Sequence, residues 1–161
     1  MRKHLLAVPL ALAFGLALSA PALAVDEVNI STGATVPGPG LAVHGHDVVA
    51  YFTDGAPTLG SAEFSAVYED ATYRFASEEN LEAFEADPAK YVPAYGGFCA
   101  YGVAVGKKFD GDPRFWKVVD GRLYLNLNGD IQAKWTEDIP GNIVEANANW
   151  AEIRSVAVGD L

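Results

Sequence analysis

Residues 64–91 read FSAVYEDATYRFASEENLEAFEADPAKY, and this segment specifies the first half of the domain. It predicts two strands, Phe64–Tyr68 and Ala71–Phe75, because aromatic and β-branched residues recur on both sides of a short polar break. Glu69-Asp70 is that break, and it predicts a tight turn. The first part of the stretch therefore reads as a β-hairpin.

The second part of the stretch predicts a short helix. Ser77 is a favourable N-cap residue, and two glutamates follow it in the first helical turn. Leu81 and Phe84 are three residues apart and share one helical face. Asp87-Pro88 ends this helix and begins another short one, since aspartate caps helices and proline fits their first turn.

A second hairpin and two helices are predicted nearer the C-terminus. Lys117–Leu125 contains Asp120-Gly121, which favours a type I′ turn between two strands. Helices are expected at Ile131–Glu137 and Pro140–Ile153, with Asp138 as the cap of the second. The sequence contains no recognisable repeat. Hairpins and helices in separate blocks predict an α+β fold, a small single domain of hairpins packed with short helices.

Residues 1–24 are predicted to be a signal peptide. Arg2 and Lys3 give a positive start, Leu5–Leu18 is almost wholly apolar, and Ala22-Leu23-Ala24 supplies the small residues of a cleavage site. The apolar run is shorter than the ~20 residues of a membrane-spanning helix. We therefore expect an exported, periplasmic protein with no membrane span after cleavage.

The rest of the chain divides into a leader and a domain. Residues 25–40 are expected to form a flexible leader, in which Val25–Ile30 has the composition of an edge strand and the glycines and prolines before Leu41 predict a loop. Residues 41–161 are expected to form the folded domain. Within it, Asp47 leads either a short strand or a single helical turn that it caps.

Acidic residues dominate the charge of the chain. Eleven lysines and arginines stand against 21 aspartates and glutamates, and two of the eleven lie in the predicted signal peptide, so the remainder carries a net charge of −12. Such a surface repels the phosphates of nucleic acids and anionic membranes. Nucleic acid is therefore not an expected partner.

Cys99 is the only cysteine of the chain. Exported domains usually pair their cysteines in disulfides, so a single thiol is a buried inert residue, a metal ligand or a reactive group. Residues 97–105 predict either a closely packed helix or a glycine-rich strand. If Gly96-Gly97 begins a helix, Cys99 lies in its first turn, where free N–H groups favour the thiolate. That feature supports metal binding and redox chemistry alike.

Two histidines and two tyrosines complete the candidate site. His44 and His46 are two residues apart and would face the same side of a strand, and with Cys99 they would supply most of a zinc or copper site. The alternative is a solvated loop in which neither ring is engaged. Tyr95 and Tyr101 flank Cys99 and are expected to line a small pocket. The sequence contains neither a Gly-x-Ser-x-Gly motif nor a phosphate-binding loop, so it gives no support to a hydrolase function.

Three stretches resemble motifs of the YHS domain family. Residues 47–51 resemble its Asp-Pro-Val opening, residues 73–77 its Tyr-x-Phe-Cys-Ser strand end, and residues 84–91 its Phe-x-x-Asp-Pro-x-x-Tyr helix exit. Residues 95–104, with two shorter stretches near the C-terminus, resemble the extension of a periplasmic branch described as YHS domain-containing (seleno)proteins. The resemblance implies the YHS fold, with Cys99 as the only cysteine that could correspond to a selenocysteine.

One departure from the family pattern concerns metal binding. Metal-handling members place cysteines at the positions that read Ala50, Ala76 and Asn80 here. The resemblance therefore implies the fold of the family without that thiolate site.

These observations predict three functions. The first is an exported module with a metal- or ligand-binding site centred on Cys99, with copper or zinc as the expected metal. The second is a thiol-redox protein in which Cys99 is catalytic and an external thiol or disulfide protein is the partner. The third is a noncatalytic interaction module. The sequence leaves open whether the protein is an enzyme.

Overall fold

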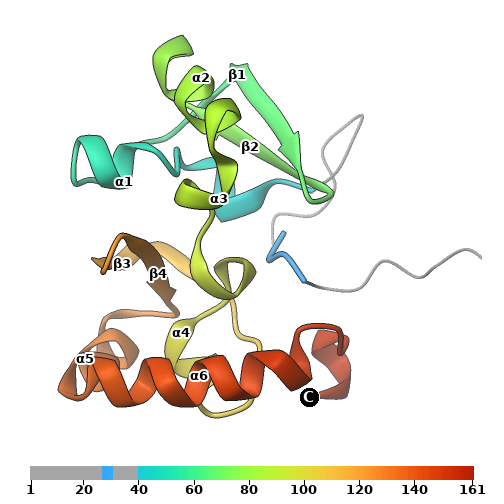
Figure 1. Ribbon diagram of the computed structural model, residues 1–161, viewed down its shortest axis with the longest axis vertical. Coiled ribbons are helices and arrows are strands. Elements are labelled where there is room, and N and C mark those ends of the chain that lie inside the picture. The colour runs from blue at the N-terminus through green and yellow to red at the C-terminus, as the bar shows by residue number, and fades with distance from the viewer. Residues whose placement is uncertain (1–26, 31–39) are drawn as a thin grey trace, which may run out of the picture.

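The computed structural model of the protein describes residues 27–30 and 40–161 (Figure 1). Short helices and two separate two-stranded antiparallel sheets make up this part of the chain. The α+β class predicted from the sequence is therefore confirmed. The predicted signal peptide and most of the predicted leader lie outside the described residues. No helix of the described part is long and apolar enough to cross a membrane.

The first half of the domain contains residues 64–91. Its elements, in order, are the 3-10 turn η1 (Ala42–Gly45), α1 (Ala50–Thr53), β1 (Ser61–Tyr68), β2 (Ala71–Phe75), α2 (Glu78–Ala86) and α3 (Pro88–Tyr91). Glu69 and Asp70 join the strands with φ values of 48° and 57°, as a type I′ turn requires. The Ser77 side chain accepts a hydrogen bond from the Asn80 N–H at 3.2 Å. Both the hairpin and the cap are therefore confirmed.

The second half has its own hairpin and helices. Its elements are η2 (Ala94–Gly97), α4 (Ala100–Ala104), β3 (Asp112–Val119), β4 (Arg122–Asn126), α5 (Gly129–Glu137), α6 (Ile139–Ile153) and η3 (Val158–Asp160). Asp120 and Gly121 form the tight turn with positive φ values. The Asp138 side chain accepts from the Gly141 N–H at 3.0 Å and caps α6. The predicted second hairpin and C-terminal helices are confirmed.

The two halves repeat one architecture, which the sequence did not reveal. The first unit (residues 42–91) and the second unit (residues 94–153) both run from a 3-10 turn through a short helix and a hairpin to a nine-residue helix and a further helix. The paired residues Ser61–Phe75 and Ser65–Arg74 flank a register shift in the first hairpin, and the pairs that flank the shift in the second hairpin lie 51 positions later.

The junctions between elements repeat as well. Both 3-10 turns contain left-handed residues, Val43 and His44 in η1, Tyr95 and Gly96 in η2. Asp87 has φ −154° and ψ 75° before α3, and Asp138 has φ −147° and ψ 77° before α6. The second unit is therefore a structural copy of the first.

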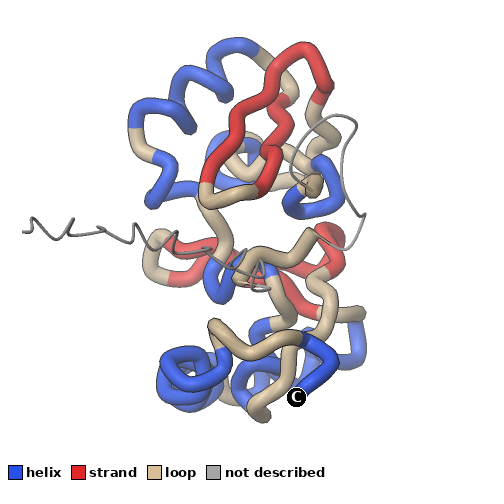
Figure 2. The backbone as a smooth tube through the Cα atoms, turned by 90° about the vertical axis from the view of Figure 1, so that its right-hand side faces the viewer, coloured by secondary structure: helices blue, strands red, loops and turns tan. Residues whose placement is uncertain are grey.

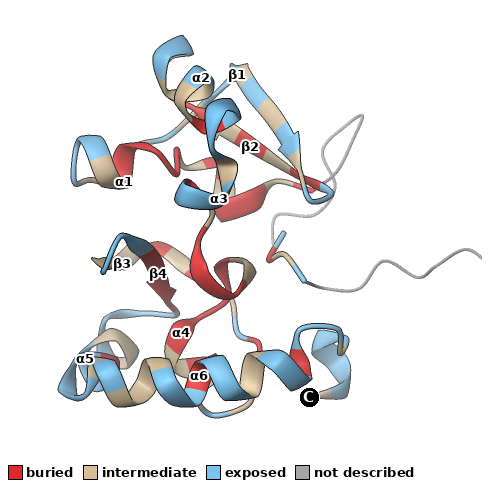
Figure 3. Cartoon of the chain, in the orientation of Figure 1, coloured by how far each residue is buried: buried red, intermediate tan, exposed pale blue. Residues whose placement is uncertain are grey.

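The strand β4 connects the two units. Its residues Leu123 and Leu125 belong to the core of the first unit, whereas Tyr124 between them belongs to the core of the second. Successive side chains of a strand point to opposite faces, so one strand serves both cores. The hairpin of β3 and β4 accordingly lies between the first unit and helices α5 and α6 (Figures 1 and 2). The buried parts of η2, α4 and β4 adjoin one another there (Figure 3).

Residues 27–30 pack against the start of the second unit. The sequence suggested an edge strand here, and that prediction is wrong for these four residues, which form no strand. Instead the Asn29 N–H donates to the Gly96 carbonyl at 2.9 Å. Gly96 has φ +61°, and a Cβ atom at this position would overlap the Glu27 carbonyl oxygen. Glycine therefore permits both the turn and this close contact.

Candidate functional site

Cys99 is fully buried, with 0 % of its surface exposed. It is the N-cap residue of α4 rather than a residue of its first turn, and its Sγ accepts a hydrogen bond from the Gly102 N–H at 3.4 Å. The thiol lies 3.7 Å from Asn126 Oδ1, to which it donates. Burial raises the pKa of Cys99 above its ordinary value, although backbone N–H groups around the sulfur act to lower it. The thiol is therefore protonated at neutral pH, contrary to the expectation from free N–H groups alone.

Asp47 holds the first unit together at one point. Its carboxylate is fully buried, and Oδ1 accepts from the N–H groups of Val49 (2.8 Å) and Ala50 (3.2 Å). Oδ2 accepts from the Ala76 N–H (2.8 Å) and from Asn80 Nδ2 (2.7 Å). Of the two structures predicted after Asp47, the helical turn is the one present, and its N-cap residue is Val49. The Asp47 carboxylate binds the N–H groups at the start of this helix and also ties α1 to the end of β2 and to α2.

Cys99 occupies in the second unit the place of Asp47 in the first. Three residues of the first unit donate backbone N–H groups to the Asp47 carboxylate. Their counterparts in the second unit are Tyr101, Gly102 and Leu127. The same three N–H groups are those that lower the pKa of the Cys99 thiol. The sulfur is therefore the counterpart of a structural carboxylate.

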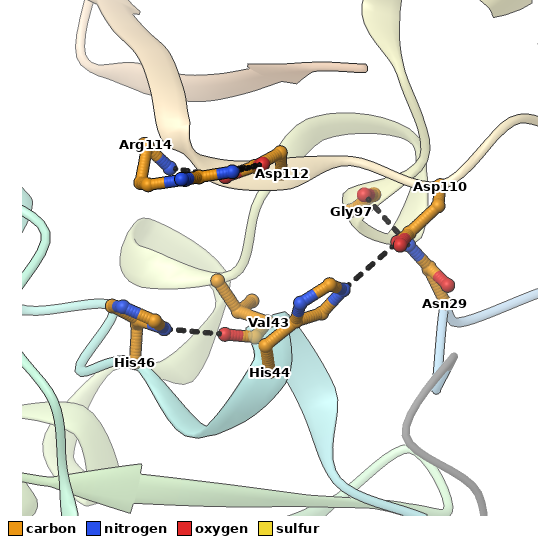
Figure 4. Close-up of polar contacts among 8 residues, drawn as sticks. All are labelled: Asn29, Val43, His44, His46, Gly97, Asp110, Asp112 and Arg114. Atoms are coloured by element: carbon orange, nitrogen blue, oxygen red, sulfur yellow. Dashed lines mark hydrogen bonds and ion pairs between the residues drawn. The ribbon is translucent and has the colours of Figure 1, made fainter. Parts of the chain in front are cut away.

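The two histidines have separate partners (Figure 4). His44 Nε2 lies 3.0 Å from Asp110 Oδ1, and His46 Nδ1 lies 3.3 Å from the Val43 carbonyl oxygen. His44 belongs to η1 and has φ +50°, so the segment is not the strand that would place both rings on one side. Burial lowers the pKa of His46, which is therefore neutral at pH 7.

The predicted metal ligands are not gathered into one site. In residues 27–30 and 40–161, no group of three or more histidine, cysteine, aspartate or glutamate side chains is placed to hold a metal ion. Cys99 contacts Asn126, and each histidine has the partner described above. Copper or zinc binding by Cys99, His44 and His46 stays a prediction from the sequence.

Tyr95 lines two cavities that together we call the Tyr95 cleft. The larger has a volume of about 300 Å³, and its walls come from both units and from Glu27 and Val28. The smaller has a volume of about 290 Å³. Three residues line both cavities, namely Tyr95, Arg122 and Trp150. Tyr101, the other predicted pocket residue, lines neither of them and packs against the second core.

Tyr95 is fixed from several sides. Its O–H donates to Asn147 Oδ1 at 3.0 Å, and its ring centroid lies 5.9 Å from those of both Tyr124 and Trp150. Burial raises the pKa of Tyr95 and of Tyr124, so both hydroxyls stay protonated at neutral pH. The cleft thus has a preformed aromatic wall with polar tips.

Charged side chains of both signs line the larger cavity, namely Arg122 and Arg154 with Glu27 and Glu69. Arg154 Nε lies 3.6 Å from Glu27 Oε1. Arg122 forms no ion pair within the described part of the chain. The sequence analysis missed Arg122, Asn147 and Trp150, because they lie far apart in the chain and belong to no motif.

The family comparison places a known domain over the first unit. Residues 49–95 match the family model of the YHS domain, so the resemblance inferred from the three motifs is confirmed. No curated protein and no solved structure matches the chain. The match ends at Tyr95, which lies in η2 at the start of the second unit. The chain therefore contains a YHS domain followed by a structural copy of it.

The YHS domain of this chain does not offer the thiolate site of metal-handling members. The three positions that would hold cysteines converge on Asp47, since Ala50 and Ala76 donate their backbone N–H groups to it and Asn80 its side-chain amide. N–H donors bind an anion and cannot coordinate a cation. Here the place of a metal site is taken by a buried carboxylate.

Proposed function

We propose, from the YHS domain at residues 49–95 and the cleft beside it, that this protein is an exported noncatalytic module that binds a small ligand in the Tyr95 cleft. The proposal of export rests on the composition of residues 1–24. The single observation that carries the binding role is the position of Tyr95, which lines the larger cavity at the junction of the two units and also the smaller cavity within the second unit. Small-molecule sites occur preferentially at such junctions, with aromatic walls and a few polar groups.

Cys99 takes a structural role in this proposal. Thiol redox chemistry and metal binding both need the thiolate, and burial opposes it here. The sulfur instead caps α4, as the Asp47 carboxylate anchors α1. This supports a binding module over a thiol enzyme. We therefore propose that the ligand binds beside Tyr95 and not at Cys99.

A fragment titration followed by NMR tests the proposal. A set of small anionic, neutral and cationic aromatic compounds is added to the isotope-labelled protein without residues 1–24. We expect bound compounds to shift the indole N–H signal of Trp150, which lines both cavities. The indole signal of Trp135, a fully buried residue of the second core, should not shift.

Two variants at exposed alanines give the matched comparison. Ala89 lies on α3 and lines the larger cavity, so Ala89→Trp should occupy part of the cleft and weaken binding at least about tenfold. Ala133 lies at an exposed position of α5 outside the cleft, and Ala133→Trp should bind as the unmodified protein does. A collection without any compound that binds, or equal binding by the two variants, would overturn the proposal.

A further inference from the structure

The smaller cavity of the Tyr95 cleft has no acidic side chain in its lining. In a chain with 21 acidic and 11 basic residues, this is an exception to the surface as a whole. The six residues that line it are Ala94, Tyr95, Arg122, Tyr124, Asn147 and Trp150. The only formal charge in the cavity wall is therefore the positive charge of Arg122.

Arg122 is held at the cavity by the second hairpin. It is the first residue of β4, directly after the Asp120-Gly121 turn, and its side chain is exposed. Arg114 on the neighbouring strand is different, because Asp112 binds its guanidinium through two carboxylate oxygens, the closest contact being 2.6 Å. No carboxylate of the described residues neutralises Arg122 in this way.

The other polar groups of the cavity complement a negative ligand. The Tyr95 hydroxyl donates to Asn147 Oδ1, which occupies the amide oxygen and leaves the amide Nδ2 as a donor. Tyr124 contributes a hydroxyl that is protonated at neutral pH. An ionised carboxylate is an acceptor only, so it matches a wall of donors around a guanidinium.

Resting on the proposed function, we infer that the ligand is a small aromatic carboxylate. Its carboxylate pairs with the Arg122 guanidinium in the smaller cavity, since the planar fork of arginine binds a carboxylate through two parallel hydrogen bonds. Its ring lies against Trp150, which lines both cavities. Arg122 thus sets the charge class of the ligand, and the aromatic wall sets its shape.

Benzoate and benzamide are suitable probes because they differ in charge and little in shape. Titration calorimetry on the protein without residues 1–24 should give benzoate an affinity at least about tenfold higher than that of benzamide. Arg122→Gln should abolish this preference. Arg114→Gln, which removes an arginine outside the cleft, should retain it. Added salt should weaken binding of benzoate more than binding of benzamide.

The outcomes separate this inference from the proposed function. Equal binding of the two probes, or a preference for benzoate that survives Arg122→Gln, would overturn the inference while leaving a ligand-binding cleft in place. Failure of both probes in the millimolar range, with other fragments still shifting the Trp150 signal, would reject the aromatic carboxylate alone. Failure of every compound would reject the cleft as a binding site and the inference with it.

Discussion

A single side chain anchors each unit, and the two anchors differ in chemistry. The Asp47 carboxyl group receives four hydrogen bonds from N–H groups. Cys99 stands in the equivalent place of the second unit, and its sulfur is larger and more polarisable than a carboxylate oxygen. Its contact with the Gly102 N–H is accordingly longer, at 3.4 Å. A thiol needs less hydration than a carboxylate, so it can be buried with fewer and weaker hydrogen bonds.

The pH dependence of stability should report on Cys99. Burial raises its pKa in the folded protein, so the unfolded chain releases the thiol proton first as the pH rises. The free energy of unfolding should therefore fall as the pH rises above the ordinary cysteine pKa of about 8.5, a decline that Cys99→Ser should reduce. Urea denaturation at a series of pH values measures both proteins. The buried tyrosines are common to the two and titrate at higher pH, so identical pH profiles would mean that the thiol is not desolvated.

At the scale of the element, local chemistry made the hairpins and helix starts predictable. The tight turns at Glu69-Asp70 and Asp120-Gly121 and the caps Ser77 and Asp138 act within a few residues, so the sequence displays them directly. The 3-10 turns η1 and η2 escaped prediction for the opposite reason. Val43 has φ +48°, a conformation that valine rarely adopts and that only the surrounding packing imposes.

The turn η2 should be sensitive to a single methyl group. Gly96→Ala adds a Cβ atom where the Glu27 carbonyl oxygen lies, on a backbone with φ +61°. We expect residues 27–30 to detach from the second unit, with a stability loss above the ~1–2 kcal/mol of an unfavourable left-handed alanine. Limited proteolysis near the N-terminus, combined with thermal denaturation, measures both effects.

Gly106→Ala provides the control for this variant. Gly106 also has a positive φ, +75°, but a Cβ atom there would meet nothing within 4 Å. It should show the conformational cost alone and leave residues 27–30 attached. Equal stability and equal proteolysis of the two variants would contradict the proposed packing of Glu27 against Gly96.

At the scale of the whole molecule, the sequence conveyed the fold class and the YHS domain but not the repeat. The counterparts Phe84 and Trp135, or Asp47 and Cys99, share a place in the architecture but differ in residue type. The Tyr95 cleft was equally hidden, because Arg122 and Trp150 are brought to Tyr95 only by the packing of the second unit. Sequence reasoning found Tyr95 solely through its nearness to Cys99 in the chain.

The shared strand should make the two units unfold together. Leu125→Ala removes a fully buried side chain of the first core from a strand that also borders the second. A loss of about 2–5 kcal/mol is expected, in one cooperative transition. NMR signals of Phe84 in the first core and Trp135 in the second, followed during urea denaturation, should shift to the same lower midpoint. If only the signal of the first core moved, the two units would be energetically independent.

The repeat has a consequence for how this chain can change over time. Each copy carries its own internal anchor, so the residue type of one anchor can change independently of the other while both copies keep the same arrangement of elements. The larger cavity has walls from both copies and so belongs to neither copy alone. New recognition can arise there at little cost to either framework.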